Sequence, residues 1–246
     1  VQARLNKLGN IKSDGRPILG LDSRNLLEIF LEQSPEGFMV PAHIWTPWFS
    51  LFGSKSGFDS IEECFDALTN HIFAFETGLS SDPDMNRQVQ AIDNYTLISN
   101  SDCHSQSKLG REANLFDTGF DFFSMRNALK DRGDNKFLGT IEFFPEEGKY
   151  HLDGHRKCEV CLYPEETRKV NSICPVCNKP LTIGVMHRVM ELANRKTPYY
   201  PKGGAPGFKS LIPLPEVLGE LLDVGSGSKK VLTEYARTID IFGSDF

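Results

Sequence analysis

Residues 95–105, YTLISNSDCHS, place an aspartate, a cysteine and a histidine close behind a short apolar run. The run Tyr95–Ile98 predicts a buried strand, and the polar residues follow the point where that strand ends. In an extended segment, residues two apart point the same way, so we expect Asp102 and His104 to face one pocket. Cys103 points away from that pocket and is interpreted as a packing residue. The stretch therefore predicts a strand that ends in reactive groups rather than in an ordinary turn.

Helix and strand patterns alternate along the first hundred residues. The spacing of apolar residues predicts three helices, each followed by a short apolar strand. Because each helix is long enough to serve as a crossover, the three strands are expected to run parallel. Strands this apolar are covered on both faces, as in a barrel or a doubly wound sheet. In order, the pairs are a helix starting at Asp22 with strand 38–42, a helix over 59–68 with strand 72–75, and a helix over 83–93 with strand 95–98. A further strand is predicted over 137–144.

A possible metal ligand stands at the end of each of these strands. His43 follows the first strand, Glu76 follows the second, and Asp102 and His104 follow the third. In α/β folds the carboxyl ends of parallel strands are where active sites are assembled. One such residue alone is more often a hydrogen-bonded turn residue, but three consecutive strands that supply them favour a catalytic metal centre. Imidazole and carboxylate ligands suit Zn, Mn or Fe, with one coordination position left for water.

A pair of Cys-x2-Cys knuckles is the strongest motif in the chain. Cys158 and Cys161 form the first knuckle, Cys174 and Cys177 form the second, and twelve residues separate the two. Two tight turns of this kind bring four thiolates to the corners of one tetrahedron, and disulfides are the alternative. The paired knuckles favour a zinc ribbon with a structural zinc ion. His155, just before the first knuckle, is interpreted either as a substrate contact or as an ordinary polar residue of the linker.

Charge is distributed unevenly along the 246 residues, whose net charge is −6. Residues 1–154 hold 14 lysines and arginines against 23 acidic residues, whereas residues 155–230 hold 12 against 7. The acidic part suits metal ligands and the basic part suits a phosphate-bearing partner, but on charge alone ordinary solvated surfaces are the favoured explanation of both. No apolar run reaches the roughly 18 residues of a membrane helix. We therefore expect no membrane partner and a cytoplasmic protein.

The segment after the ribbon combines cations, aromatic residues and glycines. Residues 195–208, RKTPYYPKGGAPGF, can place aromatic faces on bases and backbone amides on phosphates, although an ordinary loop has a similar composition. The candidate nucleic-acid contacts are Tyr199, Tyr200, Phe208 and Lys209. A helix is predicted before this segment over 185–193, and two more after it over 215–224 and 229–239.

Three motifs together resemble the polymerase and histidinol phosphatase (PHP) superfamily. They are PAHIWTPW at 41–48, FETGLSSDP at 75–83 and SNSDCHS at 99–105. With GTIEFFPEEGKYHLDGHRKC at 139–158, the cysteine knuckles and GFKSLIPLPEVL at 207–218, the chain resembles the endonuclease Q family. The resemblance implies an α/β fold with three parts. They are the C-terminal part of a distorted (β/α)7 barrel over 1–145, a zinc ribbon over 146–184, and a helical nucleic-acid-binding segment over 185–246.

The resemblance also implies a function. The family comprises hydrolases that cut DNA on the 5′ side of a deaminated base, such as uracil, hypoxanthine or xanthine, or of an abasic site. His43, Asp102 and His104 match direct ligands of catalytic divalent metals, with Zn or Mn expected, and Glu76 matches a position that braces the site. The early ligands of the barrel have no counterpart in the sequence, so we expect a fragment of a longer protein with weak or no catalysis. Two other functions stay open: a small-molecule phosphatase or phosphodiesterase, and a non-catalytic zinc-ribbon interaction protein.

Overall fold

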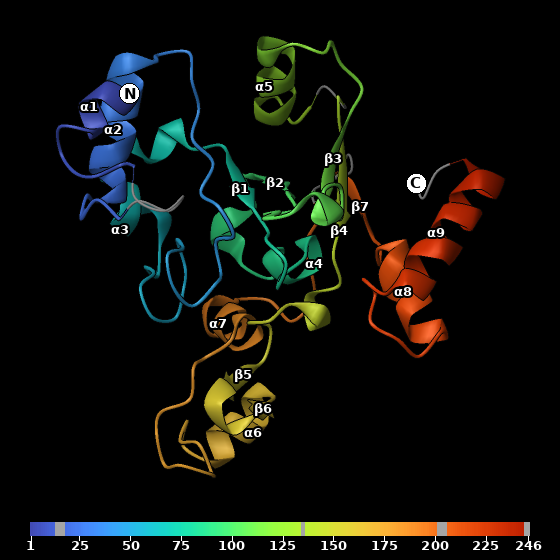
Figure 1. The fold of residues 1–246 in the computed structure, drawn as a ribbon. Coiled ribbons are helices and arrows are strands. Elements are labelled where there is room, and N and C mark those ends of the chain that lie inside the picture. Colours follow the sequence, from blue (N-terminus) through green and yellow to red (C-terminus); the bar gives the residue numbers. More distant parts are fainter. Residues whose placement is uncertain (13–17, 134–135, 201–205, 244–246) are drawn as a thin grey trace.

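The computed structural model describes residues 1–12, 18–133, 136–200 and 206–243. Three groups of elements follow one another along the chain (Figure 1). The first group comprises α1 (Gln2–Leu5), α2 (Ser23–Gln33), α3 (Ile61–Phe65), β1 (Ala74–Glu76), α4 (Pro83–Asn86) and β2 (Thr96–Ile98). The second comprises β3 (Ala113–Phe116), α5 (Phe122–Lys130), β4 (Phe137–Glu142), β5 (Asp153–His155), β6 (Val160–Leu162) and α6 (Pro164–Lys169). The third comprises α7 (Val185–Leu192), β7 (Gly207–Ser210), α8 (Leu214–Leu221) and α9 (Lys229–Phe242).

The predicted parallel pairing is present between β1 and β2. Their register aligns Phe75 with Leu97 and Glu76 with Ile98, so both strands end at the same edge. All six residues of the two strands are buried, including the polar Glu76 and Thr96. The helix predicted to start at Asp22 is confirmed as α2, whereas the second and third predicted helices are shorter than expected. The second ends at Phe65, because the next residue, Asp66, adopts a left-handed backbone with φ of 48°.

The predicted strand 38–42 is not a strand. The segment runs past the end of β1, where the Glu76 N–H donates to the Pro41 carbonyl and the Ile44 N–H donates to the Glu76 carbonyl. Proline has no N–H to donate, so a regular ladder does not continue through Pro41. The strands in the described residues form sheets of two, three and two strands, and no closed barrel is found among them. The fold there is mixed α/β.

A second sheet, missed in part by the sequence analysis, is centred on β4. The predicted strand β4 pairs antiparallel with β3 and parallel with β7, and neither partner was predicted. At Gly139 the backbone has φ of 140°, and an added Cβ would lie 1.9 Å from the Gly207 carbonyl oxygen. Only glycine permits this approach of the two strands. Residues 207–210, expected in a loop and a helical segment, are therefore part of the central sheet.

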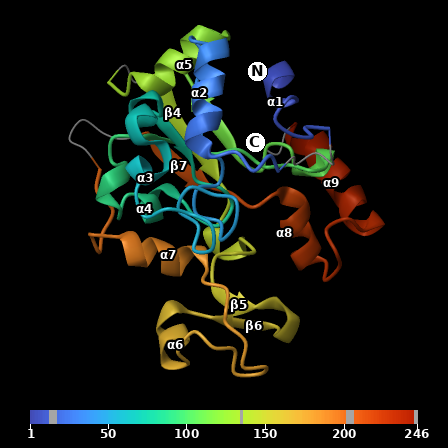
Figure 2. The same cartoon turned by 90° about the vertical axis from the view of Figure 1, so that its left-hand side faces the viewer.

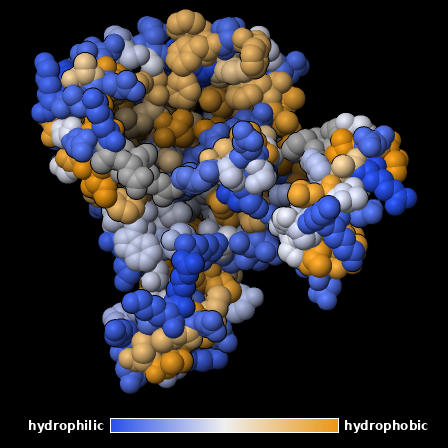
Figure 3. Space-filling view, in the orientation of Figure 1, coloured by the Kyte–Doolittle hydropathy of each residue, from blue (hydrophilic) through white to orange (hydrophobic). Residues whose placement is uncertain are grey.

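The main hydrophobic core lies between the helices and the β1–β2 pair. Trp45, Phe52 and Phe75 are among its largest fully buried side chains. Helix α7, which follows the ribbon, contributes Val185 and Val189 to the same core. Apolar side chains also remain exposed next to and within α5, near the top of the space-filling view (Figure 3), where Phe120, Phe122 and Phe123 are at least half exposed.

Two smaller lobes extend from this body (Figures 1 and 2). The lower one consists of the antiparallel β5–β6 hairpin and α6, and it corresponds to the predicted ribbon. The other is the pair α8 and α9, which confirms the two helices predicted there. None of the helices in the described part of the chain is long and apolar enough to cross a membrane.

Candidate metal centres

His43 begins a long loop and is fixed at its backbone by Glu76. One carboxylate oxygen of Glu76 accepts a hydrogen bond from the His43 N–H at 2.7 Å, and the other accepts one from the Asn100 side-chain amide at 2.7 Å. His43 has a left-handed backbone with φ of 32°, which is unusual for a residue other than glycine. Gly78 packs against it, since a Cβ there would come within 2.7 Å of the His43 Cβ. Glu76 thus links the end of β1 to both neighbouring segments.

Asp102 and His104 lie together after β2. The Asp102 Oδ1 and the His104 Nε2 are 3.5 Å apart, and both side chains are about half exposed or more. An extended backbone would place the two side chains on one side, but Asp102 instead has a left-handed backbone with φ of 42°. Such conformations often mark functional sites, because the surrounding structure must hold them. Carboxylate and imidazole in contact provide two donors for a divalent metal.

Two residues that the sequence analysis missed hold the segment before Asp102. The Asn114 side chain accepts from the Ser99 N–H at 3.0 Å and donates to the Ser99 carbonyl at 2.8 Å. The Arg111 guanidinium donates to the Ser101 carbonyl at 2.8 and 3.2 Å. Both residues lie at or just before β3, a strand that the sequence did not predict. Their polar character directly after the Asp-x-His motif was the available signal.

Buried carboxyl groups lie beneath this edge. Glu142 is fully buried and accepts hydrogen bonds from the hydroxyls of Thr140 and Thr77, yet burial raises its pKa to about 7. Glu112 accepts a hydrogen bond from the Phe143 N–H, and its other oxygen has no hydrogen-bond partner. Burial, and then the charge of Glu142, raise the pKa of Glu112 to about 8. This shift favours the protonated form of Glu112 at neutral pH.

The predicted catalytic ligands do not form one cluster in the described residues. No three of them bring ligand atoms within 4.8 Å of one another. His43 is connected to the Asp102 segment through Glu76 and Asn100 instead. The structure therefore brings Asp102 and His104 together and attaches His43 to the same edge.

Among the described residues, one group of side chains could hold a metal ion, and it lies in the ribbon. Its residues differ in part from the predicted ones. It consists of His155, Cys158, Cys174 and Cys177, whose ligand atoms all lie within 4.8 Å of one another. Cys161, predicted as a ligand, is exposed on β6 opposite Gly154 and lies outside the cluster. The structure thus brings three of the four predicted cysteines together with His155, while the four-cysteine ligand set stays a prediction.

The backbone conformation explains why His155, and not Cys161, lies in this cluster. In the second knuckle, Cys174-x2-Cys177 is followed by Asn178 with φ of 57°. In the first, His155-x2-Cys158 is followed by Glu159 with φ of 54°. The two knuckles therefore match when His155 is the first ligand, and the chain has already entered β6 at Cys161. The signal available in the sequence was the His-x2-Cys spacing.

The electrostatics of this cluster suit a metal ion. Burial opposes ionisation of Cys174, but the N–H groups of Cys177 and Val176 outweigh it and lower the pKa to about 7. Burial, and then the neighbouring Cys177 and Cys174, raise the pKa of Cys158 to about 11 in the absence of metal. Three thiols and an imidazole at this spacing can hold one zinc ion, whose charge favours the thiolates. Four protein ligands leave no position for water, so such a site is structural.

The four predicted nucleic-acid contacts lie on two separate segments, the irregular chain after α7 and strand β7. The Arg195 guanidinium lies over the Tyr199 ring, 4.6 Å from the centroid of that ring. The Tyr200 hydroxyl contacts Asp84. Phe208 and Lys209 lie on β7, with Lys209 exposed. Residues 201–205 of this segment lie outside the described residues. A cavity of about 620 Å³ opens between α4 and α7, lined by Met85, Met186, Val189, Met190 and Lys196 among others.

The structure is that of a mixed α/β protein with a small lobe whose cysteine–histidine cluster could hold a metal ion, and it can be compared with known proteins. No family model matches the chain. The chain is 33% identical over 209 residues to the uncharacterized protein MJ0043 of Methanocaldococcus jannaschii, covering 82% of this chain and 25% of that protein. It is 36% identical over 189 residues to the uncharacterized protein YqxK of Bacillus subtilis, covering 76% of this chain and 46% of that protein.

Two solved structures match almost the whole chain. The lesion-specific endonuclease PfuEndoQ from Pyrococcus furiosus has a TM-score of 0.82 and 31% identity. Endonuclease Q in complex with a 27-mer duplex bearing an abasic lesion at the active site has a TM-score of 0.86 and 30% identity. Each match covers 99% of this chain and 60% of the solved chain. These two matches support the endonuclease Q family for this chain, which spans less than two thirds of the length of the relatives it matches.

Proposed function

We propose that this chain is part of a metal-dependent DNA-repair endonuclease, a hydrolase that cuts a phosphodiester bond next to a damaged nucleotide. One observation carries the proposal. A relative solved with an abasic duplex at its active site superimposes on 99% of this chain with a TM-score of 0.86. The proposed cut lies on the 5′ side of a deaminated base (uracil, hypoxanthine or xanthine) or of an abasic site.

Asp102, His104 and His43 are the proposed ligands of the catalytic divalent metals, with Zn or Mn expected. The contact between Asp102 and His104 at 3.5 Å and the exposure of both side chains support this assignment. Glu76 is the proposed brace, since both of its oxygens already accept hydrogen bonds from the His43 and Asn100 segments. A divalent metal at such a site would polarise the scissile phosphate and lower the pKa of a bound water.

The proposal also assigns roles to the rest of the chain. Residues 1–145 are the part related to the PHP barrel, residues 146–184 are the ribbon, and residues 185–246 approach DNA with Tyr199, Tyr200, Phe208 and Lys209. The excess of 12 basic over 7 acidic residues in 155–230 supports a polyanionic partner. The relatives come from a bacterium and an archaeon, whose DNA lies in the cytoplasm, and we place the reaction there.

End-labelled duplexes test this proposal directly. The chain, supplied with Mn or Zn, is mixed with duplexes that carry one abasic site, uracil or hypoxanthine, or no damage. We expect tighter binding to the damaged duplexes and a nick, even if slow, on the 5′ side of the lesion. The matched variant Asp102→Asn should keep the binding and lose the nick. Equal affinity for damaged and undamaged duplexes, with hydrolysis of a sugar phosphate instead, would contradict the proposal in favour of a small-molecule phosphatase.

A further inference from the structure

The loop that begins at His43 is long and ordered. This His43 loop, residues 43–59, contains no helix or strand, yet its backbone closes on itself. The Phe52 N–H donates to the Ile44 carbonyl at 2.7 Å, and the Phe58 N–H donates to the Leu51 carbonyl at 2.7 Å. At its start, the Thr46 hydroxyl lies 3.1 Å from the His43 Nδ1. The loop therefore behaves as one packed unit, and its position determines where His43 lies.

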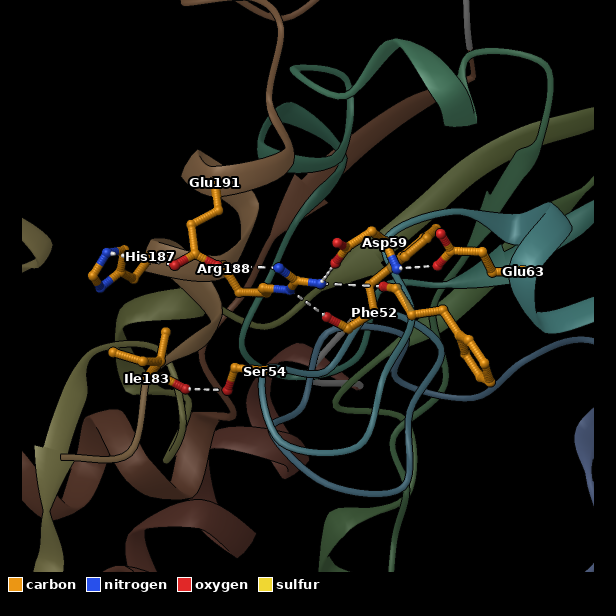
Figure 4. A network of polar contacts seen from close by, with 9 residues as sticks. Phe52, Ser54, Asp59, Glu63, Ile183, His187, Arg188 and Glu191 are labelled. Carbon is orange, nitrogen blue, oxygen red and sulfur yellow. Dashed lines mark hydrogen bonds and ion pairs between the residues drawn. The ribbon is translucent and has the colours of Figure 1, made fainter. Parts of the chain in front are cut away.

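The far side of this loop is held by α7 rather than by its own neighbours in the sequence (Figure 4). Arg188 donates from Nε to the Phe52 carbonyl at 2.9 Å and from Nη2 to the Phe58 carbonyl at 3.2 Å, and it also pairs with Asp59. Its side chain is only 13% exposed. A hydrogen bond of 2.7 Å from the Ser54 hydroxyl to the Ile183 carbonyl adds a second attachment. All of these contacts join residues about 130 positions apart.

The beginning of α7 is held in turn by the ribbon. Asp153 is fully buried, and its carboxylate accepts the Gly184 N–H at 2.6 Å and lies 2.6 Å from the His187 Nδ1. Asp153 lies on β5, two residues before His155, a member of the cysteine–histidine cluster. A contiguous path of contacts thus leads from the zinc cluster through Asp153 to the first turn of α7, and from there through Arg188 to the His43 loop.

We infer that the structural zinc site positions the His43 loop through α7, with Arg188 as the positioning residue. Without zinc the ribbon has too small a core to hold β5 in place, so Asp153 would no longer fix the first turn of α7. Arg188 and Ile183 would then lose their fixed relation to the loop. Coupling of this kind needs a continuous physical connection between the two sites, and the contacts above supply one. The link to catalysis rests on the proposed role of His43, whereas the coupling itself does not.

Both tryptophans of the chain lie on the His43 loop, which makes the inference measurable. Trp45 is buried and donates to the Asn86 side chain at 2.8 Å, whereas Trp48 is 42% exposed and contacts Tyr150 edge-on. Tryptophan emission therefore reports on this loop alone, because the sequence contains two tryptophans. Quenching by acrylamide measures how often the loop opens, and it requires neither DNA nor a catalytic metal.

A double-mutant cycle tests the coupling on the zinc-loaded 246-residue chain. The variants are Arg188→Ala, Cys177→Ser and their combination, with Arg24→Ala, which removes an exposed ion pair on α2, as the matched control. We expect each single variant to raise the quenching constant about twofold through local opening of the loop. The double variant should add little to either, because both changes break the same path. Hydrogen exchange of residues 44–59 should show the same pattern, while that of β4 stays unchanged.

Two results would overturn the inference. One is unchanged quenching in Arg188→Ala or in Cys177→Ser. The other is full additivity in the double variant, which would show that zinc and Arg188 act on the loop independently. Loss of exchange protection throughout β4 would identify global unfolding instead of coupling, and it also counts against the inference. DNA cleavage is not measured, so a chain that shows the coupling but never nicks damaged DNA would refute the proposed function alone.

Discussion

Glu76 shows how one side chain can organise a site without binding the substrate. Its two oxygens accept hydrogen bonds from segments 33 and 24 residues away, so it connects the edge of β1 to the His43 loop and to the Asp102 segment. His43 and Asp102, two of the nine described non-glycine residues with a positive φ, are also residues that the sequence singled out as ligands. Sequence reasoning identified the residue types, but it could not predict these backbone conformations, which tertiary contacts enforce.

Glu112 provides a prediction about stability and pH. Burial raises the pKa of Glu112 from 4.5 to about 8, so the folded state binds its proton more tightly than the unfolded state does. The free energy of unfolding of the parent chain should therefore fall as the pH rises from about 5 to 8. Glu112→Gln removes this titration and should be the more stable form at pH 8.5 by a few kcal/mol, since each pKa unit is worth about 1.4 kcal/mol.

Urea unfolding at pH 5, 6.5 and 8.5 checks this expectation. The control is Glu220→Gln, which changes an exposed carboxylate on α8. Its stability should follow the pH dependence of the parent chain. An identical pH dependence for Glu112→Gln and the parent chain would show that Glu112 does not titrate in this range.

At the scale of elements, the pattern of apolar residues predicted those strands and helices whose formation depends mainly on the local sequence. The apolar runs at 72–75, 95–98 and 137–144 correspond to β1, β2 and β4, and the periodicity around 185–193 corresponds to α7. Strands β3 and β7 were missed because they are short and partly polar, and they exist only through pairing with β4. The strand expected at 38–42 is absent because Pro41 cannot continue a ladder, although the segment does approach β1.

The ribbon gives a prediction that separates the two ligand sets. His155→Ala should lower the zinc content well below one ion per chain and destabilise the β5–β6 hairpin, because it removes one of four ligands. Cys161→Ala should retain one zinc ion, since Cys161 is exposed on β6 and outside the cluster. Elemental analysis after dialysis measures both. Loss of zinc in Cys161→Ala together with retention in His155→Ala would restore the four-cysteine site.

At the scale of the whole molecule, the three groups of elements are less independent than the sequence suggests. The ribbon forms a lobe of its own, but the helix that follows it supplies Val185 and Val189 to the main core and holds the His43 loop. Strand β7 joins the central sheet before the chain leaves for α8 and α9. Such contacts between distant segments cannot be predicted from local sequence patterns. They connect the ribbon with the proposed active site.

Anomalous diffraction from a Mn-soaked crystal of the chain tests the central claim most directly. The account holds that hydrolytic metal ions bind at the strand edge, separately from the zinc ion of the ribbon. It predicts a manganese peak in contact with Asp102 and His104, a zinc peak among His155, Cys158, Cys174 and Cys177, and loss of the manganese peak alone in Asp102→Asn. A zinc peak in the ribbon with no manganese at Asp102 and His104 would contradict it.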